Sequence, residues 1–185
     1  MSRPVPIWNV HEQYEDDIIE TLENTFGALE YGDDLLTALI YAASNAVEDN
    51  FSDYLSELMY CREDSFLEEL DELNVKKYFK EALECSVSYM LLERCCGGAA
   101  DDYRKLVDFS SVINFNTRET LNALGTAASD ISEMALREIS ATVRNLQIAE
   151  KKQIRTFAEK PKVQYPNNTK NISNSERSFD NGNHI

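Results

Sequence analysis

Large apolar residues recur every three or four positions over most of this 185-residue chain, and little interrupts the repeat. That spacing is the period of one face of an α-helix, whereas a half-buried strand would alternate every second residue. The chain has only 6 glycines and 4 prolines, too few for the many turns of a β-sandwich. At 43% hydrophobic, it has enough apolar residues to fill a core. The sequence therefore predicts an all-α fold, a compact multi-helix bundle.

Residues that start or stop helices separate the periodic segments. Asn9 is expected to cap a first helix that Gly27 ends, and Asp33 is expected to cap the second. Asn74 is expected to cap a later long helix, which ends where Gly97 follows two cysteines. The expected helices span 10–26, 33–47, 52–60 and 75–95, with a one- to two-turn piece that opens at 64 or 65 and a weak helical turn at 101–107.

A last, long helix is expected after a capping box formed by Asn116 and Glu119. Its apolar stripe continues far along the chain. Gly125 is its weak point, where a kink or a break would occur. The segment 112–115 is the best strand candidate, but a lone strand has nothing to pair with.

The charge is distributed unevenly along the chain. The formal net charge is −15, and residues 1–84 contain 21 acidic and 5 basic residues, against 12 acidic and 13 basic in 85–185. Basic residues recur in the last helical stretch, after which the chain becomes polar and loses its period. We therefore expect one helical domain over 1–160, with an acidic front half and a long basic last helix, followed by a disordered tail over 161–185.

Motifs for catalysis, metals or cofactors are incomplete or missing. His11 and Glu12 begin an HExxH zinc pattern, but Glu15 stands where the second histidine is needed. The four cysteines form no CxxC pair and are best explained as buried apolar thiols. The sequence contains neither a phosphate-binding glycine loop nor a nucleophile elbow. We therefore expect no enzyme activity, no metal and no cofactor.

Cellular location is predicted by what the sequence does not contain. No apolar run approaches ~18 residues, and the first residues do not resemble a signal peptide. We therefore expect a cytoplasmic protein with reduced thiols and no membrane contact. The acidity also disfavours binding of the whole surface to nucleic acid or to an anionic membrane.

Rows of carboxylates on packed helices can imitate the phosphates of DNA. Duplex DNA carries one negative charge per ~1.7 Å of axis, and one helix face presents a side chain every three or four residues. Such a surface is attracted to a basic nucleic-acid channel, although net charge can also merely keep a protein soluble. The basic last helix either contacts phosphate or a partner, or pairs with the acidic helices. Its candidate residues are Arg137, Arg144, Lys151, Lys152 and Arg155.

Several segments resemble proteins of mobile genetic elements. The most specific is 114–127, with the sequence NFNTRETLNALGTA. The others are 7–12, 64–67, 86–95, 130–133, 136–139 and 175–178. Together they resemble an internal segment of the very large polyvalent proteins that conjugative elements and phages of Firmicutes encode. The chain as a whole also resembles type II-A anti-CRISPR proteins of gut Firmicutes, which block the RNA-guided DNA nuclease of type II systems.

The anti-CRISPR resemblance implies an inhibitor whose partner is the type II effector nuclease with guide RNA bound. It implies that either DNA loading or the nuclease-domain docking needed for cleavage is blocked. The acidic front half supplies the candidate contacts, Glu15, Asp16, Glu20, Glu23, Asp33, Asp34, Glu68, Glu69, Asp71 and Glu72. Two alternatives stay open, a DNA-binding accessory module that acts through the basic last helix and a metal-dependent antirestriction hydrolase remnant. The sequence makes no prediction of oligomeric state.

Overall fold

The computed structural model describes residues 10, 12–30, 32, 34–97 and 99–158 of the chain. These residues form five α-helices and two short 3₁₀ helices, with no strand among them. The α-helices are α1 (Glu15–Phe26), α2 (Leu35–Cys61), α3 (Glu72–Cys95), α4 (Ala99–Leu106) and α5 (Arg118–Ala158), and the 3₁₀ helices are η1 (Glu12–Tyr14) and η2 (Ser110–Asn114). The predicted all-α, multi-helix fold is therefore confirmed. The tail predicted at 161–185 lies outside the described residues.

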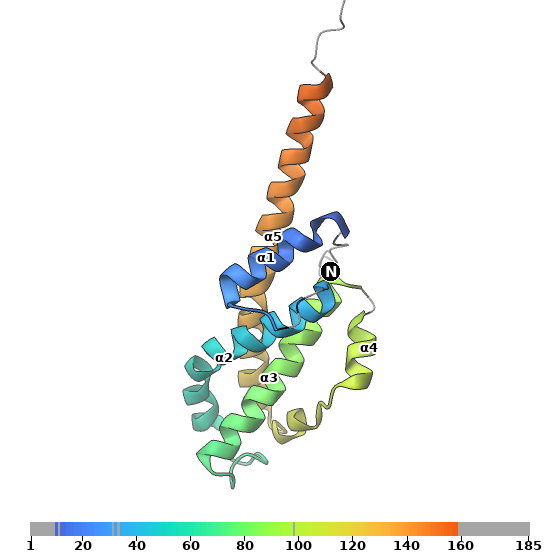
Figure 1. Ribbon diagram of the computed structural model, residues 1–185. Coiled ribbons are helices and arrows are strands. Elements are labelled where there is room, and N and C mark those ends of the chain that lie inside the picture. Colours follow the sequence, from blue (N-terminus) through green and yellow to red (C-terminus); the bar gives the residue numbers. More distant parts are fainter. Residues whose placement is uncertain (1–9, 11, 31, 33, 98, 159–185) are drawn as a thin grey trace, which may run out of the picture.

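Three long helices make the body of the bundle (Figure 1). α2 packs against α3 and α5, and α3 also packs against α5. α1 lies across α2 and α5, while α4 and η2 cover parts of α3. The last turns of α5 project beyond the other helices (Figure 1), and the side chains at 147–155 are exposed. No helix in the described part of the chain is both long and apolar enough to cross a membrane.

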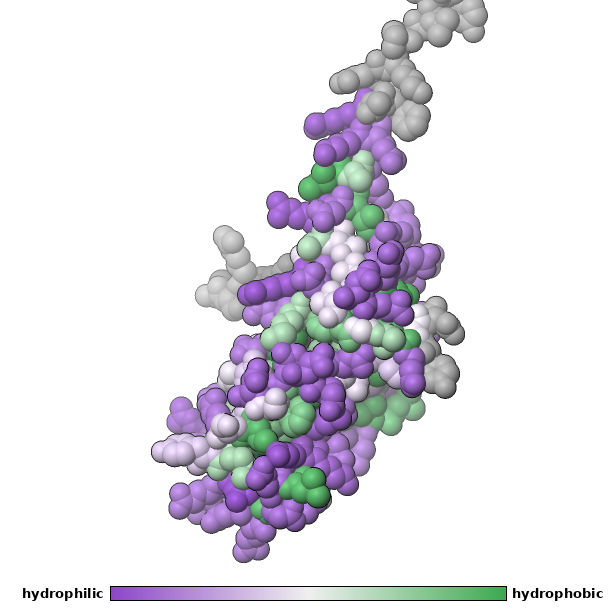
Figure 2. Space-filling model, turned by 60° about the vertical axis from the view of Figure 1, so that its left-hand side comes forward, coloured by the Kyte–Doolittle hydropathy of each residue, from purple (hydrophilic) through white to green (hydrophobic). Residues whose placement is uncertain are grey.

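One hydrophobic core joins the helices, and its burial is the main source of stability. A large apolar side chain contributes about 1.5–3 kcal/mol when it is fully buried. α2 and α5 each add four buried alanines, whose small side chains let neighbouring helices approach closely. The face shown in Figure 2 is mainly hydrophilic but has hydrophobic patches. The fully buried large side chains include Ile18, Leu22, Leu39, Leu58, Phe79, Leu83, Ile131 and Ile139.

α2 is one continuous helix of 27 residues, which corrects the prediction of separate helices at 33–47 and 52–60. Polar residues such as Glu48 and Asp49 suggested a loop between them, but the segment contains neither glycine nor proline. Both side chains are exposed, and Asn50 donates Nδ2 to a carbonyl of the same helix at 2.8 Å. A polar run without a helix breaker therefore marks a solvent-facing turn of the helix and not its end.

The caps of α2 and α3 also differ from the predicted ones. Asp34, not Asp33, is the N-cap of α2, and its Oδ1 accepts the Thr37 backbone N–H at 2.8 Å. Asp33 lies outside the described residues. Asp71, not Asn74, caps α3, so α3 begins three residues before the predicted start at 75. Aspartate accepts backbone N–H groups at a helix start as well as asparagine does, so residue type alone did not distinguish the two.

α5 starts and continues differently from the prediction. Its first turn is closed by Thr117, whose Oγ1 accepts the Thr120 N–H at 3.2 Å, so the predicted capping box at 116–119 is wrong. Asn116 instead accepts the Phe66 backbone N–H at 2.8 Å. Gly125 does not interrupt the helix: a Cβ at this position would meet no atom within 4 Å, as expected for a solvent-facing helical residue.

Three short segments correct the remaining local predictions. The strand candidate at 112–115 falls at η2, where Val112 and Phe115 each bond a carbonyl three residues earlier. With no neighbouring strand in the described chain, such local bonds satisfy the backbone. The piece expected from 64 or 65 is a series of turns, and the weak turn at 101–107 is the eight-residue helix α4.

The boundaries of α1 and α3 are partly as predicted. α1 begins at Glu15, after η1, and not at residue 10, while the expected cap Asn9 lies outside the described residues. Gly27 ends α1 as predicted, with φ 88° and its N–H bonded to the Glu23 carbonyl at 2.9 Å. That φ suits glycine because a Cβ would be strained there. α3 ends at Cys95, also as predicted.

Candidate functional site

The solvent-facing side of α1 is a row of carboxylates. Its opposite stripe is apolar, with Ile18 and Leu22 fully buried. Helical spacing places residues 16, 20 and 23 on one face. No ion pair in the described part of the chain engages any acid of this row. We call the exposed residues Asp16, Asp17, Glu20 and Glu23 the α1 acidic face.

Two of the predicted contact residues are helix caps. Asp34 caps α2, as described above. Asp71 accepts the Asn74 backbone N–H at 2.9 Å and the Asn74 Nδ2 at 2.8 Å. The backbone hydrogen bond, with support from the side-chain bond, lowers the pKa of Asp71 below its ordinary value. These carboxylates therefore stabilise helix starts and are less available to a partner.

Two further predicted acids also have partners within the protein. Glu68 lies in the α2–α3 turn (62–71), and Glu72 follows the turn as the first residue of α3. Glu72 forms an ion pair with Lys76 at 2.7 Å, and this hydrogen bond lowers the pKa of Glu72. Glu68 accepts the Asp64 backbone N–H at 2.8 Å. Glu69 is exposed and takes part in no ion pair of the described chain. Interactions within the protein therefore engage some of these carboxylates and stabilise the conformation of the turn.

Glu15, the first of the predicted acids, lies apart from the α1 acidic face. It is half-buried and, with Asp34, lines a hollow of about 360 Å³ beside Cys95 and Cys96. Burial raises the pKa of Cys96 to about 11, with contributions from the charges of Glu15 and Asp34, and burial raises the pKa of Cys95 to about 12. Both thiols are therefore protonated at neutral pH, which fits their interpretation as apolar groups.

A second row of acids, on α2, was missed by the sequence analysis. Asp49, Asp53 and Glu57 are exposed and four residues apart, so successive carboxylates rise by about 6 Å along one helix face. No ion pair in the described residues engages them. We call these three residues the α2 acidic row. Their spacing is visible in the sequence, but the loop expected between 47 and 52 concealed it.

The nine predicted acids that the structure describes do not form one patch. α1 lies across the middle of the molecule, whereas the α2–α3 turn lies at its lower end (Figure 1). The predicted acids of the turn are thus separated from those of α1 by the length of α2, along which the α2 acidic row lies. The negative surface consists of several regions. In two of them, the α1 acidic face and the α2 acidic row, no acid takes part in an ion pair of the described chain.

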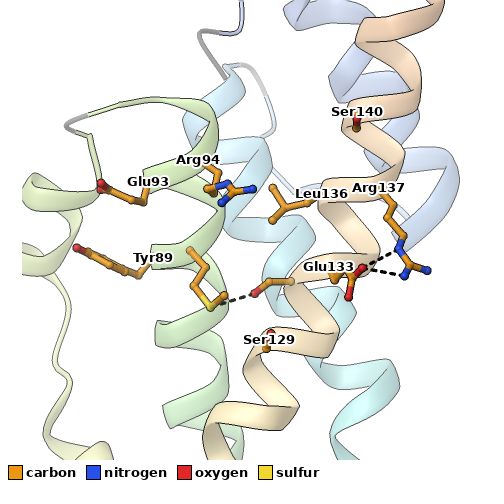
Figure 3. A pocket seen from close by; sticks show the side chains of 10 residues that line it. Tyr89, Glu93, Arg94, Ser129, Glu133, Leu136, Arg137 and Ser140 are labelled. Atoms are coloured by element: carbon orange, nitrogen blue, oxygen red, sulfur yellow. Dashed lines mark hydrogen bonds and ion pairs between the residues drawn. The ribbon is translucent and has the colours of Figure 1, made fainter. Parts of the chain in front are cut away.

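A groove of about 510 Å³ runs between α3 and α5 (Figure 3). Met90 and Leu136 line it with apolar surface, and Ser132 donates its hydroxyl to a backbone carbonyl of α5 at 2.6 Å. On its rim, Glu133 and Arg137 form an ion pair at 2.8 Å. Its lining contains neither histidine nor cysteine. Glu93 and Arg94 also line it, so the groove combines apolar surface with charged side chains.

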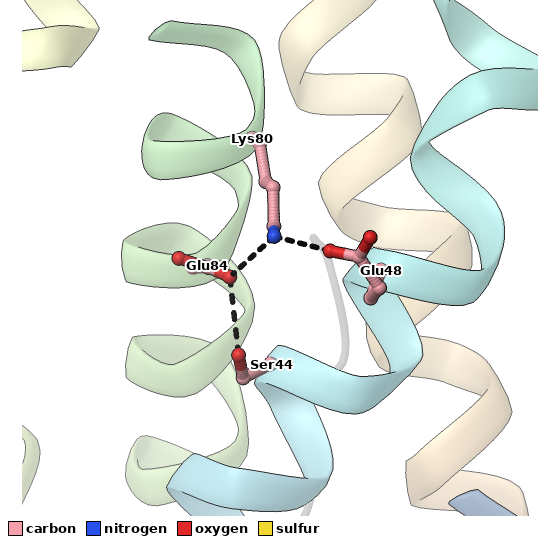
Figure 4. Close-up of polar contacts among 4 residues, drawn as sticks. All are labelled: Ser44, Glu48, Lys80 and Glu84. Carbon is pink, nitrogen blue, oxygen red and sulfur yellow. Dashed lines mark hydrogen bonds and ion pairs between the residues drawn. The ribbon is translucent and has the colours of Figure 1, made fainter. Parts of the chain in front are cut away.

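A polar cluster ties α2 to α3 (Figure 4). Lys80 forms an ion pair with Glu48 and lies 3.9 Å from Glu84, and Ser44 donates a hydrogen bond to Glu84 at 3.1 Å. The hydrogen bond to Glu48 raises the pKa of Lys80. Glu48 therefore differs from its neighbour Asp49, because its charge is compensated within the protein.

The predicted basic residues extend from the middle of α5, where Arg137 lies at the groove, to its outer part. Arg137 is paired with Glu133 on its own helix, and Arg144, Lys151, Lys152 and Arg155 are exposed. Near them, Glu150 accepts hydrogen bonds from Gln13 and Tyr14 at 2.8 and 2.9 Å, which fixes this part of α5 to η1. The basic residues do not pair with the α1 acidic face or the α2 acidic row in the described chain.

The zinc pattern noted in the sequence has no counterpart in the described residues. These contain no group of three or more His, Cys, Asp or Glu side chains that could hold a metal ion, and His11 itself lies outside them.

No protein-family model matches the chain, and no curated protein and no solved structure is significantly similar to it. The function is therefore inferred from the chemistry of the surface and from the sequence resemblance.

Proposed function

We propose that this protein is an anti-CRISPR inhibitor that binds the type II RNA-guided DNA nuclease through its acidic helical surface. The observation that carries the proposal is the α1 acidic face, four exposed carboxylates that have no ion pair in the described chain. The α2 acidic row adds three carboxylates at regular spacing. The resemblance to type II-A anti-CRISPR proteins supplies the identity of the partner.

The nuclease has the surface that such carboxylates would recognise. It holds its RNA–DNA heteroduplex in a positively charged channel and reads the motif beside its target through arginine side chains. An anionic helix face attracts these cationic groups over a distance, which accelerates association and makes it sensitive to salt. Carboxylates that are not already paired lose less on binding, because no internal ion pair must be broken.

Two modes of inhibition follow from binding in or near the channel. The inhibitor either prevents DNA from loading, or leaves DNA bound and prevents the nuclease-domain docking that licenses cleavage. Order of addition separates them. An inhibitor of loading acts only when it is added before DNA, whereas an inhibitor of docking also acts on a preformed nuclease–DNA complex.

The test is DNA cleavage by the purified, guide-loaded nuclease. A molar excess of this protein is expected to suppress cleavage, and heat-denatured protein is expected to have no effect. Unchanged cleavage at molar excess would falsify the proposal. Gel filtration of the mixture provides an independent readout, because a stable complex elutes before the nuclease alone.

A DNA-binding accessory module is the second candidate function. It is favoured by the outer part of α5, where Arg144, Lys151 and Arg155 are exposed on a helix that projects beyond the body (Figure 1). Such residues can contact phosphate, and the contact weakens as salt rises. Gel shifts with duplex DNA, with and without the nuclease, distinguish the two candidates. DNA binding that survives charge reversal of Arg144, Lys151 and Lys152 would exclude the second one.

A further inference from the structure

The end of the bundle where α2 leads into α3 and η2 leads into α5 lies opposite the projecting end of α5 (Figure 1). Large apolar side chains are exposed at this end. Tyr60 is 92% exposed, Phe66 61%, Leu73 78% and Ile113 66%, and we call these four residues the apolar end. Figure 2 shows hydrophobic patches among hydrophilic side chains at this lower end. Single exposed apolar residues are ordinary, but several at one end of a small protein are typical of a binding surface.

The backbone beneath the apolar end is held in place. Leu67 is fully buried and anchors the α2–α3 turn to the core. Arg62 donates Nη1 to the Leu70 carbonyl at 2.9 Å, which closes the turn from within. The Phe66 N–H bonds Asn116 at 2.8 Å, which ties the turn to the start of α5. Phe66 is thus exposed on a fixed backbone, and a preorganised contact loses less conformational entropy on binding.

The acids around the apolar end select the charge of its partner. Glu63, Asp64 and Glu69 are exposed in the same turn as Phe66, and no ion pair in the described chain engages them. Exposed acids outnumber the exposed basic residues of this end, Lys77 and Arg118, so a second copy docked end to end would bring mainly like charges together, which is unfavourable. Lysine or arginine side chains around an apolar recess would complement both features of this end.

We propose that the apolar end is a protein-docking surface whose occupant is an apolar recess flanked by lysine or arginine side chains. This inference rests on the proposed function, since the nuclease is the protein that would supply the recess. A few side chains that fill a recess, aromatic ones above all, contribute most of the affinity of an interface, while charges at the rim set its orientation and salt sensitivity. The apolar end is therefore the anchor, and the α1 acidic face and α2 acidic row steer the approach.

The test compares two double variants by their affinity for the immobilised, guide-loaded nuclease. Phe66→Ser with Leu73→Ser removes two side chains of the apolar end. Leu106→Ser with Ile154→Ser removes two side chains that are 87% and 68% exposed outside the apolar end, and serves as the matched control. Because all four side chains are exposed, both variants are expected to keep the wild-type melting temperature. Tyr60→Ser with Ile113→Ser repeats the test on the other two residues of the apolar end.

The apolar-end variants are expected to bind at least about 30-fold more weakly, and the control to stay within about twofold of the wild type. If wild type and all variants bind equally, the docking surface is overturned while the proposed function stands. If the wild type does not bind the nuclease, both are overturned. Sedimentation of the protein alone gives a further outcome: a dimer that the Phe66→Ser, Leu73→Ser variant dissolves would make a second copy the occupant and overturn the proposal.

Discussion

The α1 acidic face and the α2–α3 turn are built from the same residue types but use them differently. On α1, Asp16 and Glu20 are exposed, and no ion pair in the described chain engages them. In the turn, Asp71 caps α3 and Glu68 accepts a backbone N–H. The number of acids therefore does not measure a binding surface. The partners that each carboxylate already has decide whether it stabilises the fold or remains available to another molecule.

The largest expected effect is on binding, when the α1 acidic face is neutralised. Each exposed charge pair contributes about 0.2–1 kcal/mol, so losing four should weaken the affinity for the guide-loaded nuclease on the order of 100-fold at low salt. The melting temperature should change little. No internal ion pair is lost, and the relief of repulsion among four neighbouring acids offsets the loss of Asp16 and Asp17 from the first turn of α1. The variant carries Asp16→Asn, Asp17→Asn, Glu20→Gln and Glu23→Gln.

A control with the same change in net charge separates position from total charge. It neutralises four exposed acids outside the α1 acidic face, and its affinity should stay within severalfold of the wild type. Equal losses in both variants would contradict the special role of α1 and would assign the attraction to net charge alone. The control carries Glu30→Gln, Glu93→Gln, Glu119→Gln and Glu138→Gln, four exposed acids that no ion pair of the described chain engages.

The next effect is on stability, when the turn is changed instead. Asp71→Ala removes the cap of α3 and leaves the Asn74 N–H without its acceptor, so the melting temperature should fall by about 2–4 °C. Glu69→Ala, in the same turn, should lower it by less than about 1 °C, because Glu69 has no ion pair in the described chain. Thermal unfolding followed by circular dichroism measures both, and equal melting temperatures would contradict the assigned cap.

The pH dependence of stability should also distinguish Asp71 from the acids of the α1 acidic face, with a smaller effect. The hydrogen bond from the Asn74 backbone lowers the pKa of Asp71 in the folded state. Its contribution is therefore complete above the unfolded pKa of about 3.9 and is lost as pH falls through the lower folded pKa. Asp71→Asn should reduce this acid-dependent loss below about pH 4, whereas the α1 variant should keep the Asp71-dependent part. A profile unchanged by Asp71→Asn is the contrary result.

The smallest effect distinguishes neighbours on α2. Glu48→Gln breaks the ion pair with Lys80 and should lower the melting temperature by at most about 2 °C, because the pair is solvent-exposed. Asp49→Asn, one residue later, should leave it unchanged but weaken nuclease binding. If Asp49→Asn is the more destabilising of the two, the division between paired and available acids on α2 is wrong.

Much of the fold was predictable, because helix stripes and helix stops are local signals. Gly27 and the Cys95 end were located from their own residue types. The predictions failed where two residues of similar type could both cap a helix, or where packing against the core decided whether a segment was helical. Asp71 and Asn74 are both good caps. The polar residues at 48–50 resemble a loop, but the apolar stripe continues from buried Val47 through half-buried side chains to buried Leu58 and holds them in a helix.

The candidate site was predictable only in part. The exposure of Asp16, Glu20 and Glu23 follows from their position opposite an apolar stripe, which the sequence contains. The structural use of Asp34 depends on a hydrogen bond that the sequence does not reveal. The apolar end could not be predicted, because Phe66 and Leu73 have the same apolar character as core residues and only the fold leaves them exposed.

The most direct test of the account is the affinity of the wild-type protein for the guide-loaded nuclease across a salt series. From about 0.01 M to about 1 M salt, the Debye length shortens from about 30 Å to about 3 Å. We predict measurable binding at low salt that weakens at least about tenfold over this range, chiefly through slower association. Absence of binding at low salt, or an affinity that does not change with salt, would contradict the claim that the acidic surface recognises a cationic partner.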